Sequence, residues 1–422
     1  MLYQLGRALS HASISKNTPS VVDISAKTIA ILGDSTAYQN TSSNGLQYLS
    51  QGFMGWVNLM TGQKYHFPTD NNLGIDNADI ADVDSAKTNL ASLSNTPDIV
   101  FVITGTKDTS SSTTETEMIN GLQSIYNYIT NTIGAKVVAL TIPPRTKYSS
   151  SDSTINGAPL DSGKQIKLEA VNNWILSQTG DIIPVDIYSS LILAGTTSPD
   201  PDKFEGEGID DTAYLYPNPL GAQSIANAIK IKLDNYFGPF DIPDMSINNL
   251  SRNPDLSGTG GINNSHLTGD LAEYYYAVTD TGASGILSKP TSTSQQINVS
   301  FTNQSSSDDV QFYPYNLINY SVGDQVIGEA EIEIISGQNV EGIWIEVKDK
   351  GSSNITYLGL NKYSEPKFPT TPGTYMFSTP IFTVQSSNTA LTLKIRAELN
   401  SSGGKTANLN MIVKQVRGRI VT

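Results

Sequence analysis

Cysteine is absent from this chain of 422 residues, which excludes disulfides, thiol catalysis and cysteine-bound metals together. Histidine, the usual catalytic base near neutral pH, occurs only three times. No apolar run reaches the roughly 18 residues that a membrane-spanning helix needs, and the amino-terminal segment lacks the apolar core of a secretory signal. We expect no membrane insertion, and we assign neither a metal site nor a cofactor.

Positive charge is also scarce. The chain has 26 Lys plus Arg against 40 Asp plus Glu, a formal net charge of -14, and no basic run of five or more residues. Binding to nucleic acid or to an anionic membrane is therefore disfavoured. Charged residues make up only 16% of the chain, whereas serine, threonine, asparagine and glycine are abundant. This balance suits an all-β or an α/β protein.

The length exceeds the roughly 250–300 residues of a single core, so we expect two domains. We interpret residues 1–26 as an anchor or linker, 27–238 as an α/β domain, 239–265 as a linker rich in Pro, Asn, Ser and Gly, and 266–422 as an all-β domain.

In the first domain, buried apolar runs alternate with amphipathic segments, which favours a parallel sheet covered on both faces. The expected strands are TIAILGD (28–34), DIVFVITG (98–105), AKVVALTIPP (135–144) and DIIPVDIYS (181–189). The expected helices are 114–133, 162–178 and 219–237.

After the linker, strands with alternating apolar residues recur, with a turn signal roughly every 10–15 residues. QQINVSFTN and ALTLKIRAELN are two of them. No helical period competes with this pattern. It predicts a β-sandwich of the jelly-roll type.

Several short motifs stand at the ends of the expected strands of the first domain. They are Gly-Asp-Ser at 33–35, Asn-Leu-Gly-Ile at 72–75, Gly-Thr-Lys-Asp at 105–108, Thr-Ile-Pro-Pro-Arg at 141–145, and Tyr-Pro-Asn-Pro-Leu-Gly-Ala at 216–222. By their order and spacing, residues 28–238 resemble the SGNH (GDSL-like) hydrolase family. The resemblance implies a three-layer, flavodoxin-like α/β domain with Ser35 as the nucleophile. It also implies Gly74 as an oxyanion donor, with Lys107 in the place of the family's oxyanion asparagine.

The chain departs from the family where a base is needed. Ala213 and Tyr216 stand where the family has its catalytic aspartate and histidine. A serine hydroxyl is a poor nucleophile without a neighbouring base, and a tyrosine of ordinary pKa stays protonated at neutral pH. Lys107 could stabilise an oxyanion, fill the vacant pocket, or pair with Asp34 or Asp108.

Other residues offer little to replace the lost base. His11 and His266 lie outside the domain, and His66 is expected about 20 Å from the serine along an extended strand. Asp210 and Asp211 would reach the site only through a shifted loop. We therefore interpret the domain as a degenerate hydrolase scaffold.

Aromatic residues suggest binding. Tyr38, Trp56, Tyr214 and Tyr216, together with Asp108, are our candidate binding residues, since aromatic rings stack on the apolar faces of sugars. In the second domain, EYYYAV (273–278), VQFYPYNLINY (310–320) and GIWIEV (342–347) fit either a sugar-binding surface or the core of the sandwich.

Two kinds of protein fit this architecture: a secreted or surface carbohydrate esterase, and a bacteriophage tail fibre or tailspike protein. The connector NNLSRNPDLSGTGG resembles the joints of phage tail proteins with this layout. We expect a virion-associated or extracellular protein that binds host-surface polysaccharide and contacts other tail proteins, as a homotrimer. The alternative is an active serine esterase that removes O-acetyl groups from such a polysaccharide. A purely structural virion component is a third possibility.

Overall fold

The computed structural model describes most of the chain. The described residues are 27–40, 47–49, 52–62, 64–145, 160–207, 213–239, 249–264, 266–280, 282–302, 307–349, 355–361, 372–385 and 390–421. The expected anchor at 1–26 lies outside this part of the chain, and so do Asp210 and Asp211. None of the described helices is long and apolar enough to cross a membrane.

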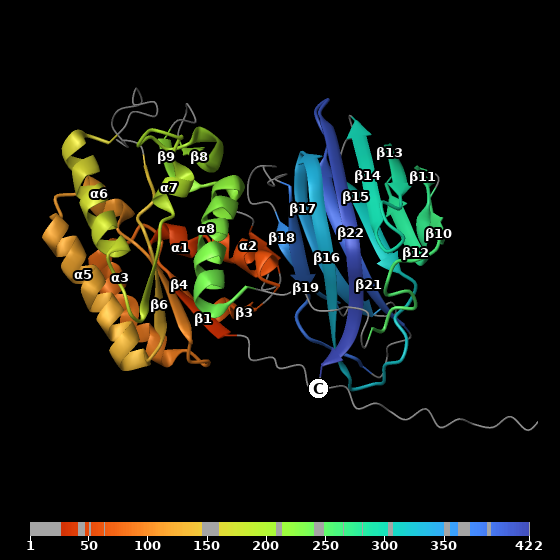
Figure 1. Cartoon of the computed structure of the whole chain (residues 1–422), viewed down its shortest axis with the longest axis horizontal. Helices are drawn as coiled ribbons and strands as arrows, with labels where there is room; N and C mark the ends of the chain where they lie inside the picture. The colour runs from red at the N-terminus through yellow and green to blue at the C-terminus, as the bar shows by residue number, and fades with distance from the viewer. Residues whose placement is uncertain are drawn as a thin grey trace, which may run out of the picture.

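The first domain is an α/β unit built on a parallel sheet, as its alternating pattern predicts (Figure 1). The strands run in the order β3-β1-β5-β6-β7, and β4 pairs with the end of β1. Their bounds are β1 (Lys27–Gly33), β3 (Tyr65–His66), β4 (Asn72–Gly74), β5 (Ile99–Ile103), β6 (Lys136–Leu140) and β7 (Ile182–Val185).

Helices cover both faces of this sheet because β1 is apolar on both. Ile29 and Ile31 join one buried cluster with α2 and α8, whereas Ala30 and Leu32 join another with α3, α5 and α6. The helices are α1 (Ser35–Tyr38), α2 (Phe53–Met60), α3 (Ile80–Ala86), α4 (Thr106–Ser110), α5 (Glu115–Tyr128), α6 (Ser162–Leu176), α7 (Tyr188–Leu191) and α8 (Pro219–Phe237). A hairpin of β8 (Phe204–Glu207) and β9 (Ala213–Pro217) precedes α8.

Three 3-10 turns and one wider, π-helical turn complete the domain. The 3-10 turns are η1 (Thr69–Asn71), η2 (Lys87–Ser92) and η4 (Pro201–Lys203), and η3 (Ile129–Ile133) is a π-helical turn that extends α5. The expected helices 114–133, 162–178 and 219–237 therefore match α5 with η3, α6 and α8 closely.

The second domain is a sandwich of two mostly antiparallel sheets (Figure 1). One sheet runs β10-β12-β15-β21-β17-β18-β2, and the other runs β11-β13-β14-β22-β16-β19, with β20 paired to β16. The bounds are β10 (Gly260–Asn263), β11 (Leu267–Gly269), β12 (Leu271–Thr279), β13 (Ala283–Ser288), β14 (Gln295–Thr302), β15 (Ser307–Pro314), β16 (Gln325–Gln338), β17 (Val340–Asp349), β18 (Ile355–Asn361), β19 (Gly373–Ser378), β20 (Phe382–Thr383), β21 (Leu391–Asn400) and β22 (Thr406–Val421).

The two domains share structure across the expected boundaries. Strand β2 (Gln47–Leu49), from the first domain, pairs in parallel with β18 at the edge of a sandwich sheet. Strand β10 begins inside the expected linker. Between the domains, the fully buried Trp56 of α2 packs against Tyr375 of β19, with ring centroids 5.8 Å apart. Gln223 of α8 donates a hydrogen bond to the Tyr375 hydroxyl.

Candidate functional site

Polar side chains gather where the parallel strands end. The strand order reverses at β1, because β4 pairs with one edge of it and β5 with the other. Ligands of open α/β sheets bind at such a switch point, beyond the carboxyl ends of the strands. A cleft of about 360 Å³ lies there, which we call the Ser35 cleft. It is lined by Asp34, Ser35, Thr36, Asn77, Ala78, Thr106, Lys107, Ser110, Arg145 and Tyr216.

The loop after β1 is fixed by a buried carboxylate. Asp34 caps α1, because its Oδ1 accepts a hydrogen bond from the Thr36 backbone N–H at 3.0 Å. Its Oδ2 accepts from the Thr106 N–H at 3.3 Å, and its own N–H donates to the Ile103 carbonyl at 3.0 Å. Asp34 thus ties the end of β1 to the end of β5. Ser35, at the first position of α1, is held at the floor of the cleft.

The Ser35 hydroxyl is bonded to the loop after β4. Its Oγ donates to Asp76 Oδ1 at 3.0 Å and accepts from the Asn77 backbone N–H at 2.7 Å. A carboxylate can hold this hydroxyl in position, but it is a much weaker activator of serine than an imidazole. No histidine is among the lining residues that the structure describes. Sequence reasoning missed Asp76, which no strand pattern or motif marked.

The expected role of Gly74 does not fit its contacts. Its N–H donates to Asn72 Oδ1 at 3.0 Å and therefore does not point at Ser35. Gly74 lies on β4 against the backbone of α1, where a side chain has no room. The backbone donor to Ser35 is that of Asn77, which has a positive φ of 55°. Asparagine tolerates this conformation better than most residues, which is the one sequence signal that Asn77 offers.

Lys107 lies in the cleft, but its partners differ from those considered. Its Nζ donates to the Asn77 carbonyl at 2.9 Å and lies 4.0 Å from an Asp79 carboxylate oxygen. It pairs with neither Asp34 nor Asp108. It therefore braces the Asp76-Asn77 loop while lining the cleft.

Asp108 is buried beneath the cleft and does not line it. Its Oδ2 accepts from the Ile80 N–H at 2.9 Å, which ties α4 to the start of α3. Burial raises the pKa of this carboxyl, against the hydrogen bond from Ile80. The expectation that Asp108 binds a ligand is corrected, because its carboxylate is engaged within the fold.

Arg145 is a second cation of the Ser35 cleft that sequence reasoning did not select. It follows β6, is largely buried, and its Nη1 donates to the Thr106 carbonyl at 2.6 Å. The Thr-Ile-Pro-Pro-Arg segment was recognised as a strand end. A cation directly after the expected strand 135–144 is the signal that could have found it.

The remaining candidates are spread over the domain. Tyr216, on β9, lines the Ser35 cleft. Ala213 and Tyr214 lie on the same strand, but their side chains are outside the described part. Tyr38, at the end of α1, is about half exposed and does not line this cleft. Trp56 is fully buried against the sandwich, so the expectation that it stacks on a ligand is corrected.

The histidines do not supply a base to this site within the described residues. His66 is on β3, which pairs with the first residues of β1, opposite Thr28, and not with its carboxyl end. Strands β3 and β4 are separate, so the expectation of one extended strand from His66 toward the serine is wrong. His266 belongs to the second domain, and His11 lies outside the described residues.

The buried Asp34 makes a testable contribution to pH dependence. Burial raises the pKa of this carboxyl, even though the Thr36 and Thr106 hydrogen bonds oppose the rise. The folded state therefore binds the proton more tightly than the unfolded state, so this group lowers stability as pH rises from the ordinary value of 3.8 through the raised folded pKa. As pH rises across that window, the free energy of unfolding of the natural protein should therefore fall relative to that of Asp34→Asn.

Urea unfolding of both proteins between acidic and neutral pH measures this slope. The asparagine amide keeps only one of the two acceptor oxygens, which shifts the free energy of unfolding of Asp34→Asn by an amount that does not depend on pH. The result is therefore the change, with pH, of the difference in free energy of unfolding between the two proteins. A difference that stays flat or moves in the opposite direction contradicts the assignment. All other carboxylates are common to the two proteins and cancel.

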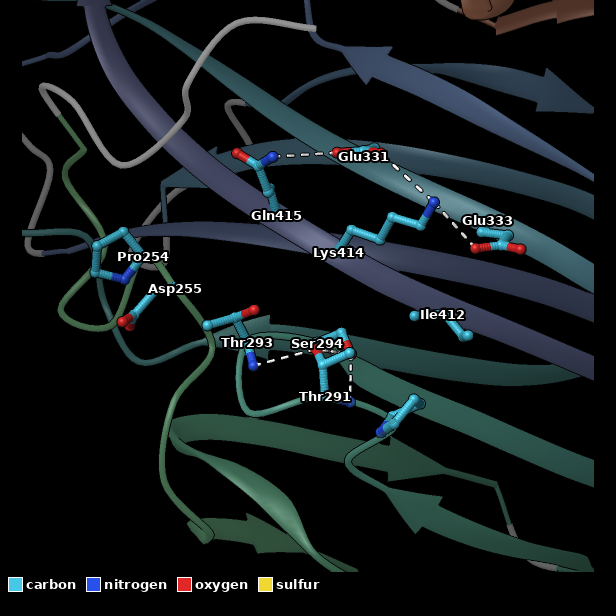
Figure 2. Close-up of a pocket in the computed structure, with 11 residues that line it drawn as sticks. Pro254, Asp255, Thr291, Thr293, Ser294, Glu331, Glu333, Ile412, Lys414 and Gln415 are labelled. Carbon is cyan, nitrogen blue, oxygen red and sulfur yellow. Dashed lines mark hydrogen bonds and ion pairs between the residues drawn. The ribbon is translucent and has the colours of Figure 1, made fainter.

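A larger cleft, of about 480 Å³, lies on the second sandwich sheet and is shown in Figure 2. Lys414 lies there 3.0 Å from Glu333 and 3.7 Å from Glu331, and the hydroxyls of Thr291 and Ser294 are hydrogen-bonded to each other. Because these groups pair with one another, we assign no ligand to this cleft. Within the described part of the chain, no group of three or more His, Cys, Asp or Glu could hold a metal ion.

Comparison with known proteins finds similarity to solved structures only. No protein-family profile and no curated protein matches this chain. One similar structure is a member of the lipolytic protein G-D-S-L family from Veillonella parvula, 17% identical with a TM-score of 0.34, covering 50% of this chain and 97% of that one. Another is a GDSL-like lipase from Bacteroides thetaiotaomicron, 15% identical with a TM-score of 0.34, covering 50% of this chain and 89% of that one.

A third is an alpha/beta hydrolase enzyme from the metagenome of Lake Arreo, 16% identical with a TM-score of 0.35, covering 49% of this chain and 94% of that one. The chain is thus similar to lipolytic and other hydrolase structures over about half of its length.

Proposed function

We propose that this chain binds a surface polysaccharide through a hydrolase-like scaffold that does not catalyse hydrolysis. One observation carries the proposal. The Ser35 hydroxyl is hydrogen-bonded to the Asp76 carboxylate and the Asn77 N–H, with Tyr216 and two cations around it and no histidine among the described lining residues. Such a cleft has the donors and the ring to bind a sugar, but lacks the imidazole that makes serine a good nucleophile.

The setting that we propose for this activity is a bacteriophage tail. An SGNH-like domain followed by a sandwich, taken by us to be of the jelly-roll type, is consistent with a tail protein that contacts host polysaccharide and other tail proteins as a homotrimer. The buried contact between Trp56 and Tyr375 supports a rigid connection between the two domains, as we expect of a tail protein that binds a cell surface.

The second candidate is an active O-acetyl esterase, and a specific observation favours it. Asp76 is within hydrogen-bond distance of Ser35 Oγ, so it could accept the proton as the hydroxyl attacks the acetyl carbonyl. Lys107 and Arg145 would then face the developing negative charge. The weakness of this candidate is chemical, because an exposed carboxylate is a poor base for a serine hydroxyl.

Acetate release separates the two candidates. We expect the natural protein to release acetate from para-nitrophenyl acetate and from acetylated xylan no faster than Ser35→Ala does, because no imidazole activates the hydroxyl. Turnover that is lost in both Ser35→Ala and Asp76→Asn would contradict the non-catalytic proposal and establish a serine–aspartate esterase.

Adsorption to cells tests the binding half of the proposal. Labelled protein is expected to adsorb to members of a panel of bacterial strains, and periodate, which cleaves the vicinal diols of surface sugars, should abolish the adsorption. Adsorption that survives periodate, or that occurs with no strain, would contradict polysaccharide binding.

A further inference from the structure

One outer face of the sandwich carries a cluster of tyrosines. Residues alternate along β12, so Tyr275 points into the core and stacks on Phe312 at 4.8 Å, while Tyr276 points to the opposite face. Tyr313 of β15 lies directly opposite Tyr276 in the strand register. Both rings therefore lie on the outer face, across two neighbouring strands.

The rings pack against one another and not into the core. The centroid of Tyr276 is 5.2 Å from that of Tyr313 and 4.4 Å from that of Tyr315, and Tyr274 meets Tyr315 edge-on at 5.9 Å. Tyr274 is 39% exposed and has a φ of 63°, a left-handed conformation that is uncommon for a bulky residue. Strained residues of this kind persist where the surrounding structure holds them and are concentrated at ligand sites.

Cations border the same rings. Lys348 of β17 and Lys394 of β21 continue the face beyond β15, and Arg252 reaches it from the connector before β10. Together with Tyr276, Tyr313 and Tyr315, these three cations line a cleft of about 360 Å³. We call it the tyrosine cleft. No carboxylate is among the described residues that line it.

The charges of the tyrosine cleft are only partly compensated. Lys394 donates to Gln311 at 2.9 Å and lies 4.8 Å from the Tyr313 ring centre. Among the described residues, neither the Arg252 guanidinium nor the Lys348 ammonium has a hydrogen-bond or ion-pair partner. Two unpartnered cations beside an aromatic surface are unusual in a chain whose net charge is -14.

Two nearby carboxylates have a cationic partner that does not line the cleft. Arg396 lies 2.5 Å from Asp309 and 3.6 Å from Glu346, and Arg396 is not among the residues that line the tyrosine cleft. Burial lowers the pKa of Lys394, and Arg396 and Lys348 act in the same direction, against Glu346 and Asp309. An anion in the cleft would therefore relieve repulsion among its cations.

We propose that the tyrosine cleft binds a saccharide that carries a carboxylate, with a sugar face against Tyr276 and Tyr315 and the carboxylate toward Arg252 and Lys348. Aromatic rings match the apolar face of a sugar ring, and paired cations at a partly buried site give charge-assisted hydrogen bonds to a carboxylate. This inference deepens the proposed polysaccharide binding by naming the glycan class. It adds a site for acidic sugars on the sandwich to the Ser35 cleft of the first domain.

Calorimetric titration of the full chain tests the proposal. The probes are tetramers of galacturonate, glucuronate and mannuronate, each compared with the tetramer of its neutral parent sugar. At least one uronate tetramer should bind, and bind at least about tenfold more tightly than its neutral parent, the value of one charge-assisted contact. Affinity should fall as salt is raised.

Variants locate the site. Lys348→Gln and Tyr276→Ala should each weaken uronate binding about tenfold or more, whereas Tyr276→Phe, which keeps the ring, should retain most of it. Lys232→Gln removes an exposed lysine of α8 far from the cleft in the chain and serves as the matched control for charge. Thermal unfolding of each variant checks that the sandwich is intact.

The possible failures are distinguishable. The proposal is overturned if no uronate tetramer binds, if the neutral tetramers bind equally well, or if Lys348→Gln binds as the natural protein does. If Lys107→Gln weakens uronate binding and Lys348→Gln does not, the acidic sugar binds in the Ser35 cleft. That result would overturn this inference and support the proposed function. Periodate-resistant adsorption to cells would instead contradict the proposed function itself.

Discussion

Replacing Gly74 by alanine is expected to destabilise the first domain by about 3 kcal/mol, the upper part of the range for overpacked sites. The added Cβ would lie 2.2 Å from the Tyr38 backbone nitrogen and 2.5 Å from the Ala37 carbonyl carbon. These are backbone atoms of α1, so no side chain can rotate away, and β4 or α1 must move. Because Ser35 begins α1, the movement should also disturb the Ser35 cleft. Urea and thermal unfolding measure the loss.

A second glycine provides the control for this experiment. Gly163, at the start of α6, has no neighbouring atom within 4 Å of an added Cβ. Gly163→Ala should therefore leave stability unchanged or raise it by up to about 1 kcal/mol, since alanine favours the helix and restricts the unfolded chain. Equal melting temperatures for Gly74→Ala and the natural protein would contradict the close packing of β4 against α1.

The sequence predicted the scaffold of the first domain because its signals are local. Buried runs such as 98–105 are apolar on both faces, as a central parallel strand must be. Helix α5 begins at a capping box formed by Thr114 and Glu117, and α8 begins at Asn218 followed by a proline. Each of these signals acts within a few residues, so the pattern alone determines the element.

The details of the Ser35 cleft could not be predicted in the same way. The motif placed Ser35 at the end of β1, but Asp76 and Arg145 reach it from loops after other strands, and only the three-dimensional arrangement of those loops decides which groups meet. The role of Gly74 as a donor is implied only by the resemblance of its motif to the SGNH family, and the motif does not show where its N–H points. Its actual constraint, the approach of α1, comes from a distant segment of the chain.

The sandwich shows the same limit in another form. Alternation indicates that every second residue of EYYYAV faces outward, and the structure agrees for Tyr275 and Tyr276. It does not indicate which strands lie beside β12. The cations Lys348 and Lys394 come from β17 and β21, far along the chain, so the tyrosine cleft exists only through strand order.

The same limit applies to Trp56, which the sequence predicts to bind a ligand and which is fully buried between the domains. An aromatic residue in a short amphipathic helix can face solvent or core, and the partner of Trp56, Tyr375, belongs to the other domain.

Trp56→Ala is expected to lower the free energy of unfolding by about 3–5 kcal/mol, through lost burial and the cavity left between α2 and β19. Because that cavity lies where the domains meet, the domains should also uncouple. Calorimetry should record one unfolding transition for the natural protein and two for the variant.

Two milder substitutions separate the ring from the hydrogen bond at this contact. Trp56→Phe keeps an aromatic ring beside Tyr375 and should retain a single transition at a lower temperature. Tyr375→Phe keeps the ring contact but removes the acceptor of the Gln223 amide, which is buried. It should therefore lower the free energy of unfolding by about 1–3 kcal/mol without splitting the transition.

A single, unshifted transition in Trp56→Ala would contradict the view that this contact joins the domains. Splitting in Tyr375→Phe alone would assign the coupling to the hydrogen bond and not to the ring. If the predicted pattern holds, the α/β scaffold and the sandwich fold as one unit, and a sugar bound at the tyrosine cleft is held rigidly relative to the Ser35 cleft.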